Sequence, residues 1–422
     1  MKKYTLTAIA LAVACASQVH AAGYQLNEYS ITGLGRSFAG AGVMGDDYSA
    51  LAYNPAGMTL VKRSGFQAGM TLAEMMSDIK DNNSGEATDM HYGVPLPSGF
   101  GQWNVNDKLF VGAGIYVPYG LSTKHDQEGF VAGSARKSEL EVIDSSLAGA
   151  YKVTDKLSLG ATVTLRYIHG HMTGDKYAIQ GRPETKIGDA NYDLDGWTGT
   201  GIIGAMYEFT PDTRVGISYK FRSIQKVKGD FTYNSQVPSG TPLGIHPITQ
   251  QIITAPDSAI ASDGLSSPDL PASVLVSAYH KATDKIGLST SVRWTEWNKS
   301  FSSFTMESSF PGSSVTQQYD WRNTWTISAG ADYYHNDNWT FRIGTAYDQS
   351  PAKSQFNRTN RIPDTNRFWL SAGLSYKSDN WQVDAGYAHI FMQKGNVAME
   401  GNTPAEYSSS ANMYGINFQY KF

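Results

Sequence analysis

The sequence predicts an all-β protein: a 14-stranded antiparallel transmembrane β-barrel with an N-terminal hatch, a plug inside its lumen. Three observations predict this fold. Apolar residues recur at every second position, long polar connections alternate with short turns, and the final segment alternates aromatic and polar residues up to Phe422. A barrel strand in a membrane needs one apolar face over about ten residues, so such alternation is its expected signature.

The first 21 residues have the features of a secretory signal. Lys2 and Lys3 form a basic start, and Leu6–Val13 is an apolar core too short to span a bilayer as a helix. Small residues precede a cleavage site after Ala21. We therefore expect a signal peptide over 1–21 and a mature chain that begins at Ala22.

The one cysteine of the chain, Cys15, lies inside this signal. A lipoprotein acylated at Cys15 is the alternative interpretation, although the usual large aliphatic residue is missing from the position three residues before it. If Cys15 leaves with the signal, disulfides and thiolate chemistry are excluded. Without Lys2 and Lys3 the chain keeps 32 basic against 38 acidic residues, which argues against a nucleic-acid partner.

The segment after the signal, Ala22–Met58, is rich in Gly, Ala and Ser and does not alternate. It ends in a rigid Asn54-Pro55-Ala56 turn, and Asp46–Tyr53 is a candidate short helix capped by Asp46. A barrel of about 14 strands has a lumen that side chains alone do not fill. We therefore expect residues 22–58 to form the hatch and residues 59–422 the barrel. A disordered tail fits its aliphatic and aromatic content less well.

Apolar residues occupy every second position in several later segments. In Leu157–Tyr167 the odd positions are apolar or aromatic, and the even positions are Ser, Gly, Thr or Arg. The same rule holds over Thr213–Arg222, Trp339–Asp348, Phe368–Tyr376 and Trp381–Tyr387. A soluble sandwich would show the same pattern. Tyr and Trp at strand ends, with charges on the other face, favour a barrel with a polar lumen.

The connections between these segments alternate in length. Short turns with Asp or Asn are expected at Asn104–Lys108, Val153–Lys156, Thr210–Thr213, Ala282–Lys285, Tyr334–Asn338 and Lys377–Asn380. Long loops are expected at Ser77–Tyr92, Leu121–Ser138, His169–Gly196, Lys228–Leu270, Asn298–Tyr319, Gln349–Arg367 and Gln393–Ser410. Seven long loops and six short turns give the count of 14 strands.

Two strands carry special signals. The last, Tyr414–Phe422, ends the chain on an aromatic residue, so we expect barrel assembly machinery of a Gram-negative outer membrane to recognise Phe422. The third, Leu109–Tyr119, contains Pro118 beside Gly120, and proline removes a donor from the ladder. In one interpretation the strand is broken at this point, and the break is either covered from inside the barrel or forms an opening. In the other, the strand ends at Val117 and a loop begins.

Four stretches resemble the FadL-type outer-membrane transporters of long-chain fatty acids: residues 22–40 (AGYQLNEYSITGLGRSFAG), Asn54-Pro55-Ala56, Asp337–Pro351 and Ile362–Gly373. The resemblance extends from Ala22 to Phe422. It implies passive uptake of long-chain fatty acids or similar hydrophobic compounds, hatch movement caused by the ligand, and lateral exit at a kink of the third strand. We expect no cofactor, metal or catalytic residue. We expect contacts with the hydrophobic ligand, outer-membrane lipids and lipopolysaccharide, besides the barrel assembly machinery.

The resemblance also implies roles for residues. The kink falls on Val117, Pro118, Tyr119 and Gly120, with the Asn54-Pro55-Ala56 turn lying against it. Tyr24 falls where the family has an aromatic residue that touches the ligand pocket. Arg322 falls near a basic pocket residue of the family.

The expected loops leave the substrate open. The third long loop, His169–Gly196, is shorter and more polar than in the fatty acid transporters of the family. The fourth keeps apolar residues for one wall of a capture groove: Leu243, Ile245, Ile248, Ile252 and Ile253. Aromatic-hydrocarbon uptake, a surface adhesin or receptor that uses the long loops, and an outer-membrane lipase are the alternatives. Arginines on the polar faces, Arg166, Arg222, Arg293, Arg322 and Arg342, either meet a carboxylate ligand or form structural ion pairs.

Overall fold

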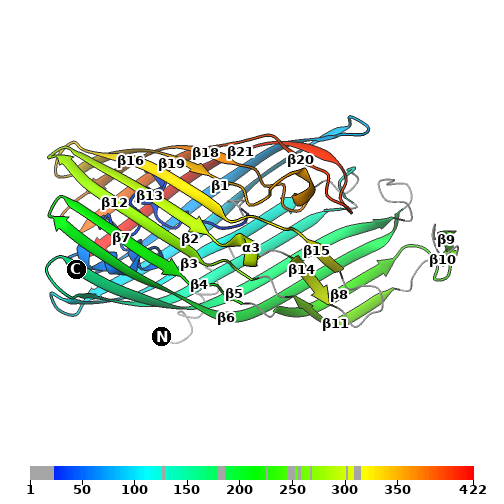
Figure 1. Ribbon diagram of the computed structural model, residues 1–422, viewed down its shortest axis with the longest axis horizontal. Helices are drawn as coiled ribbons and strands as arrows, with labels where there is room; N and C mark the ends of the chain where they lie inside the picture. Colours follow the sequence, from blue (N-terminus) through cyan, green and yellow to red (C-terminus); the bar gives the residue numbers. More distant parts are fainter. Residues whose placement is uncertain are drawn as a thin grey trace.

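The computed structural model describes residues 23–125, 129–132, 134–177, 186–224, 227–245, 252–254, 258–266, 269–300, 303–307 and 315–422. Within these ranges fourteen strands form a closed antiparallel barrel, in which the last strand pairs with the first (Figure 1). The wall consists of β1 (Gly65–Asp81), β2 (Ala87–Asn104), β3 (Leu109–Lys124), β4 (Lys137–Lys152), β5 (Leu157–Tyr177), β6 (Lys186–Thr210), β7 (Thr213–Lys220), β12 (Ser273–Thr283), β13 (Ile286–Thr295), β16 (Thr324–Tyr334), β17 (Trp339–Asp348), β18 (Arg367–Lys377), β19 (Trp381–Met392) and β21 (Ala405–Lys421).

Shorter strands lie at the long-loop end of the barrel. β8 (Val227–Ser235) pairs with the start of β6 and, on its other edge, with β11 (Ala259–Ser266). β11 pairs in turn with β14 (Ser303–Glu307), and β14 with β15 (Val315–Gln318). β20 (Gly395–Val397) pairs with β21. β9 (Pro242–Ile245) and β10 (Ile252–Thr254) form a separate hairpin at the far tip (Figure 1). Two short helices, α3 (Trp297–Ser300) and η4 (Gln355–Asn357), lie between wall strands.

The turns confirm one set of predictions and correct another. All six predicted short turns connect consecutive wall strands. The prediction of long loops over Ser77–Tyr92 and His169–Gly196 is wrong. Strand β1 continues to Asp81 and β2 begins at Ala87, while β5 continues to Tyr177 and β6 begins at Lys186. Beyond a bilayer both faces of a strand meet water. The apolar alternation therefore stops while the backbone ladder goes on.

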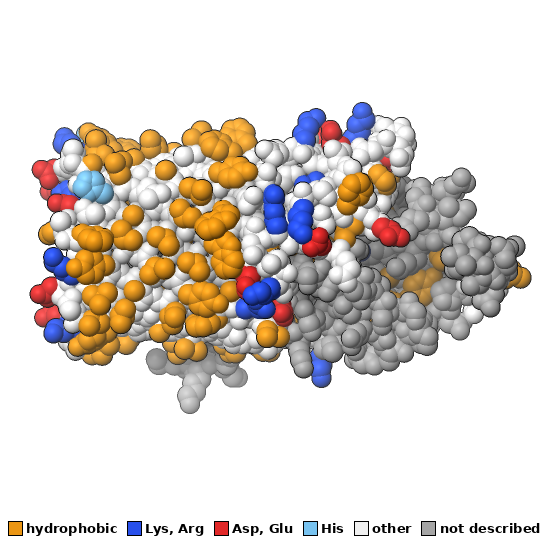
Figure 2. All heavy atoms as spheres, in the orientation of Figure 1, with side chains coloured by type: hydrophobic (Ala, Val, Ile, Leu, Met, Phe, Trp, Pro, Cys, Tyr) orange, Lys and Arg blue, Asp and Glu red, His pale blue; other side chains and the backbone are white. Residues whose placement is uncertain are grey.

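The outer surface carries an apolar belt, which Figure 2 shows as a broad band of hydrophobic side chains between charged rims. Side chains more than half exposed in this belt include Leu147, Val163, Ile203, Ile343, Leu370 and Ile416. Their polar neighbours along the strands point into the lumen and are buried, such as Ser146, Thr164, Ser371 and Asn417. This arrangement is the reverse of a soluble protein and fits a wall surrounded by lipid. No helix among the described residues is long and apolar enough to cross a bilayer.

The two ends of the barrel wall meet at its short-turn end. The Phe422 amide donates to the Ser64 carbonyl over 2.9 Å, and Arg63 Nε donates to the Phe422 carbonyl over 3.1 Å. Arg63 also donates to the Lys421 and Asp379 carbonyls. The residue that precedes β1 thus binds both the last strand and the turn beside it.

Residues 23–60 lie inside the barrel (Figure 1) and are almost all buried. They form α2 (Ile31–Leu34), η1 (Ser49–Ala52) and η2 (Pro55–Leu60). The predicted helix over Asp46–Tyr53 is wrong in length and cap, because only Ser49–Ala52 is helical and Asp47, not Asp46, accepts from the Ser49 amide. Asp46 instead binds two arginines, as described below.

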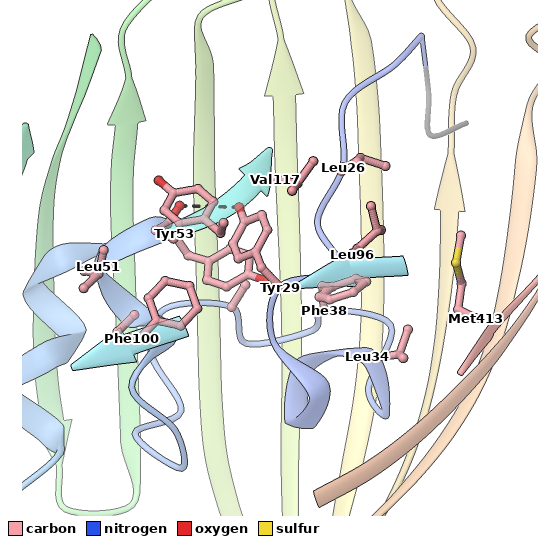
Figure 3. Close-up of a cluster of buried hydrophobic side chains, with 14 of the residues drawn as sticks. Leu26, Tyr29, Leu34, Phe38, Leu51, Tyr53, Leu96, Phe100, Val117 and Met413 are labelled. Atoms are coloured by element: carbon pink, nitrogen blue, oxygen red, sulfur yellow. Dashed lines mark hydrogen bonds between the residues drawn. The ribbon is translucent and has the colours of Figure 1, made fainter. Parts of the chain in front are cut away.

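An apolar core joins this segment to the wall. Figure 3 shows Tyr29 and Tyr53 of the segment packed beside Phe100 of β2 and Val117 of β3. The Tyr29 and Tyr53 rings are stacked with centroids 4.5 Å apart. Aromatic pairs of this kind add about 1 kcal/mol beyond the area they bury. The lumen at this level is therefore filled by protein.

The predicted signal peptide and the cleavage after Ala21 lie outside the described residues.

Candidate ligand path through the barrel

The Asn54-Pro55-Ala56 turn lies against a patch of glycines on the wall. The Asn54 side chain caps η2 and donates to the Ala205 carbonyl of β6 over 3.0 Å. A Cβ atom at Gly160 of β5 would lie 2.5 Å from the backbone nitrogen of Ala56, and a Cβ at Gly216 of β7 would lie 2.7 Å from the side-chain nitrogen Nδ2 of Asn54. Only glycine leaves room for the turn at these positions. We call Gly160, Gly204 and Gly216 the glycine seat.

The expected contact between this turn and the kink at Val117–Gly120 is therefore wrong. The contacts of Asn54–Ala56 are to β5, β6 and β7. The physical reason is that the kink already has a partner: Tyr24–Leu26, at the start of the segment, binds the backbone of β3 there.

A buried ion network fixes the opposite side of the segment. Arg36 Nη1 lies 2.8 Å from Asp46 Oδ2 and 3.0 Å from Asp332 Oδ1 of β16, and its side chain is 2% exposed. Arg342 of β17 reaches the same two carboxylates. Burial alone would raise the pKa of Asp46, but the charges of Arg36 and Arg342 bring that pKa below its ordinary value. Removing one partner would leave an uncompensated charge, so the network holds residues 36–46 to the wall.

The third strand is bulged where proline was noted in the sequence. Tyr116 pairs with Asp144, whereas Tyr119 pairs with Val142, so β3 has one more residue than β4 in this interval. A bulge of this kind bends the strand and disrupts its ladder. The strand nevertheless continues to Lys124, so the alternative in which it ends at Val117 is wrong.

Above this bulge β3 leaves its other neighbour. Pairing between β2 and β3 covers Gly99–Asn104 and stops at the Gly99–Ile115 pair. The N-terminal segment takes over as partner: the Leu26 amide donates to the Pro118 carbonyl, and the Gly120 amide donates to the Tyr24 carbonyl, both over 2.9 Å. The break predicted from Pro118 and Gly120 is thus covered from inside, by two residues of the N-terminal segment.

A pocket opens beside Tyr24, toward the long-loop end. It is a narrow cavity of about 70 Å³ that is open to solvent at its mouth. Its apolar wall comes from β3, β4, β5, β6 and β8: Leu121, Leu140, Ile168, Met172, Leu194 and Val227. Tyr24 also contacts Trp297 of α3, with ring centroids 4.9 Å apart, and Trp297 contacts Trp321. The sequence-based placement of Tyr24 at a pocket agrees with this geometry.

The basic group of the pocket is Arg361, not Arg322. The Arg361 guanidinium donates to Ser138 Oγ over 2.7 Å and to the Lys137 and Thr173 carbonyls. Burial lowers the pKa of Arg361, and among the described residues it makes no ion pair with a carboxylate. Arg322 donates to the Ser350 carbonyl and does not line the pocket.

Sequence reasoning missed Arg361 because it lies in a loop, where no alternation shows which residues face inward. The one available signal was its position directly before the Ile362–Gly373 stretch.

The other arginines mostly form structural ion pairs. Arg166 binds Asp144 through two hydrogen bonds of 2.6 and 2.7 Å, and Arg222 binds Glu296. Arg342 binds Asp46 and Asp332. Arg293 donates to the Asn27 side chain.

The predicted capture residues lie elsewhere. Ile245 and Ile252 pair across the β9–β10 hairpin, and Ile252 is 65% exposed at the tip of the molecule (Figure 1). Ile252 does not line the pocket beside Tyr24. Ile248 lies outside the described residues. A role of this hairpin in ligand capture stays a prediction.

Glu28 is a buried acid in the N-terminal segment. Its Oε2 accepts from the Asn27 amide, and its Oε1 has no hydrogen-bond partner among the described residues. Burial raises the pKa of Glu28 to about 7. The charge of Asp348 adds to this increase, and the charge of Arg367 partly offsets it. The folded state therefore binds the proton more tightly than the unfolded chain.

Its titration makes a testable prediction. The contribution of Glu28 to the free energy of unfolding is expected to be fully present below about pH 4.5 and to fall by about 3 kcal/mol as the pH rises to about 7. Glu28→Gln should abolish this part of the pH dependence. The melting temperature from pH 4 to 8 measures it, with Glu86→Gln in an exposed turn as the control. Equal slopes for wild type and Glu28→Gln would contradict the assignment.

Comparison with known proteins places this geometry in context. A family model described as outer membrane protein transport protein (OMPP1/FadL/TodX) matches residues 12–422. The chain is 31% identical over 455 residues to a long-chain fatty acid transport protein of Salmonella typhi, with 99% of both chains covered. It is 32% identical over 457 residues to the 47 kDa outer membrane protein of Pasteurella multocida, covering 100% of this chain and 99% of that one.

Solved structures show the same fold. A FadL homologue of Pseudomonas aeruginosa has a TM-score of 0.83 at 24% identity, covering 95% of this chain and all of that one. The toluene transporter TodX of Pseudomonas putida has a TM-score of 0.70 at 18% identity, with 95% of this chain covered.

Proposed function

The chain belongs to the OMPP1/FadL/TodX family of outer-membrane transport proteins, which are transporters of hydrophobic compounds, and from this premise we propose that it carries long-chain fatty acids inward by diffusion. In this proposal the ligand enters the pocket beside Tyr24, displaces the start of the N-terminal segment, and leaves sideways through the break between β2 and β3. Residues 22–58 act as the hatch.

One observation carries the proposal: Tyr24 belongs to both the pocket and the cover of the break. Its side chain lines the apolar pocket, and its carbonyl accepts from the Gly120 amide of the bulged strand. A ligand that moves Tyr24 therefore also loosens the partner of β3. Binding and opening are thus coupled through one residue, and no energy source is needed beyond the ligand's partition.

The charge of the pocket favours a fatty acid over a hydrocarbon. Arg361 presents a half-buried guanidinium beside the apolar wall, which suits a carboxylate head with an alkyl tail, and Glu139, the acid that also lines the pocket, is paired with Lys137. An aromatic hydrocarbon would use the wall alone and would leave Arg361 without a role in binding.

Arg361→Ala is expected to weaken binding of a long-chain fatty acid by about 10- to 100-fold, the effect of one lost hydrogen bond to a charged group. Binding of toluene should stay within about twofold. Isothermal titration of the purified barrel with both compounds measures the difference, and Arg322→Ala, outside the pocket, is the matched control. Equal losses for both compounds would mean that Arg361 only supports the loops, and a preference for toluene would favour aromatic-hydrocarbon uptake.

Two partners belong to the proposal as well. Recognition of Phe422 by barrel assembly machinery fits its position at the free end of the last strand. Contact with lipopolysaccharide and other outer-membrane lipids would involve the apolar belt and the charged rim above it (Figure 2).

A further inference from the structure

The break between β2 and β3 has two edges, and the bulge of β3 accounts for only one. From Ala87 to Ser98, β2 pairs with β1 alone. The free edge of β3 is satisfied by Tyr24 and Leu26. Along Pro95–Ser98, no backbone hydrogen bond from another described residue covers the free edge of β2 in this way, although an open strand edge in a membrane exposes polar backbone groups to lipid.

The direction of each backbone amide in β2 follows from the ends of the strand. The Val105 amide donates to the Leu109 carbonyl in the turn to β3, and the Asn104 amide donates to Ser64 beside β1. Backbone groups alternate in direction along a strand, so the odd residues of β2 face β3 and the even residues face β1. Above Gly99, the last residue paired with β3, the next two that face the break are Pro97 and Pro95.

Both residues lack the amide hydrogen that a ladder needs. Pro97 pairs with Met70 of β1, and Pro95 pairs with Leu72; the side chains of Met70 and Leu72 are 44% and 43% exposed in the apolar belt. The missing donors therefore lie at membrane depth, on the side where no strand pairs. Proline is tolerated in a sheet mainly where its nitrogen faces no partner, and here two such positions follow each other.

The break is bounded at both ends. Below it, Gly99 pairs with Ile115. Above it, the Tyr92 hydroxyl of β2 donates to the Ser122 carbonyl of β3 over 2.5 Å, so a side chain bridges the strands where a ladder would otherwise join their backbones. Between these points three residues of β2 face β3, and the prolines remove the amide donors of two of them, leaving that of Gly93.

We propose that Pro95 and Pro97 are positioning residues that keep β2 and β3 apart when the hatch moves. The inference rests on the proposed lateral exit. When a ligand displaces Tyr24–Leu26, the Pro118 carbonyl and the Gly120 amide lose their partners, and β2 is the nearest replacement. With amides at positions 95 and 97, β2 would pair with β3 and seal the path. With prolines it has no donor to offer there.

The test replaces both prolines by valine, which restores two donors in a good strand former. For Pro95→Val with Pro97→Val we expect fatty acid uptake by cells to fall at least fivefold. Spin labels at His91 and Lys124, at the outer ends of β2 and β3, should show new dipolar broadening as the strands approach. Pro95→Ala with Pro97→Ala should act in the same direction with a smaller effect. Leu96→Val, an inward residue between the prolines, is the matched control and should change neither readout.

The outcomes separate the two proposals. Closer labels with reduced uptake support the role of the prolines. Labels that stay as far apart as in wild type, in a barrel that still shifts in mobility on heating, overturn it whatever the uptake. Closer labels with unchanged uptake overturn the lateral exit and the function assigned to the prolines, while leaving the binding of fatty acid at Arg361 intact.

Discussion

Deletion of Pro118 is expected to reduce fatty acid uptake at least tenfold, to the level of cells without the protein. The deletion leaves one residue of β3 for each residue of β4 between Tyr116 and Tyr119, so the bulge disappears. A straight β3 would continue its ladder with β2 above Gly99 and close the proposed exit. It would also turn away from Tyr24 and Leu26, which bind the bulged backbone.

Uptake of labelled oleate by cells, normalised to the amount of folded barrel in the outer membrane, measures this effect. Val117→Ile, which keeps the bulge, serves as the control. Uptake within twofold of wild type in the deletion variant would show that the ligand leaves by another route, even if binding to the purified barrel is normal.

Substitution of Gly160 by valine is expected to convert the closed barrel into a leaky one. The first side-chain atom would lie 2.5 Å from the Ala56 amide nitrogen and 2.5 Å from the Pro55 carbonyl carbon. These are backbone atoms that cannot rotate away, so the Asn54-Pro55-Ala56 turn must leave the glycine seat. The wall itself is unaffected, because residue 160 keeps its pairs with Ala150 and Gly204.

Single-channel conductance of purified protein in planar bilayers measures the leak. Wild type should show no steady open level, because residues 23–60 fill the lumen, and Gly160→Val should show one. Gly149→Val is the matched control, since a Cβ at Gly149 meets nothing within 4 Å. A silent Gly160→Val barrel would mean that the turn is not needed to hold the hatch in place.

The barrel wall was predictable from the sequence because lipid imposes a simple rule on it. Every membrane-level strand places one face in hydrocarbon, so Leu157–Tyr167 or Trp339–Asp348 can be recognised without knowing their neighbours. The ends of β1, β2, β5 and β6 were missed because that rule stops at the membrane surface.

The site was less predictable because its contacts join residues far apart in the chain. Nothing local to Asn54 indicates that it meets Ala205 rather than Pro118, since this depends on how the whole segment packs. Arg361 comes from a loop without periodicity. Pro95 and Pro97 were visible in the sequence, but their meaning depends on which side of β2 each amide faces, and only the register with β1 and β3 determines that.

The pairing of β1 with β21 constrains the order in which the molecule can be made. The seam joins the two ends of the wall, and Arg63 binds carbonyls of Lys421 and Phe422 across it. Because β21 follows every other wall strand in the chain, the cylinder stays open until β21 has reached β1. Residues 23–60 precede β1 directly, so they must already be folded inward when the seam forms. The seam between β1 and β21 therefore closes around the segment 23–60 that leads into β1.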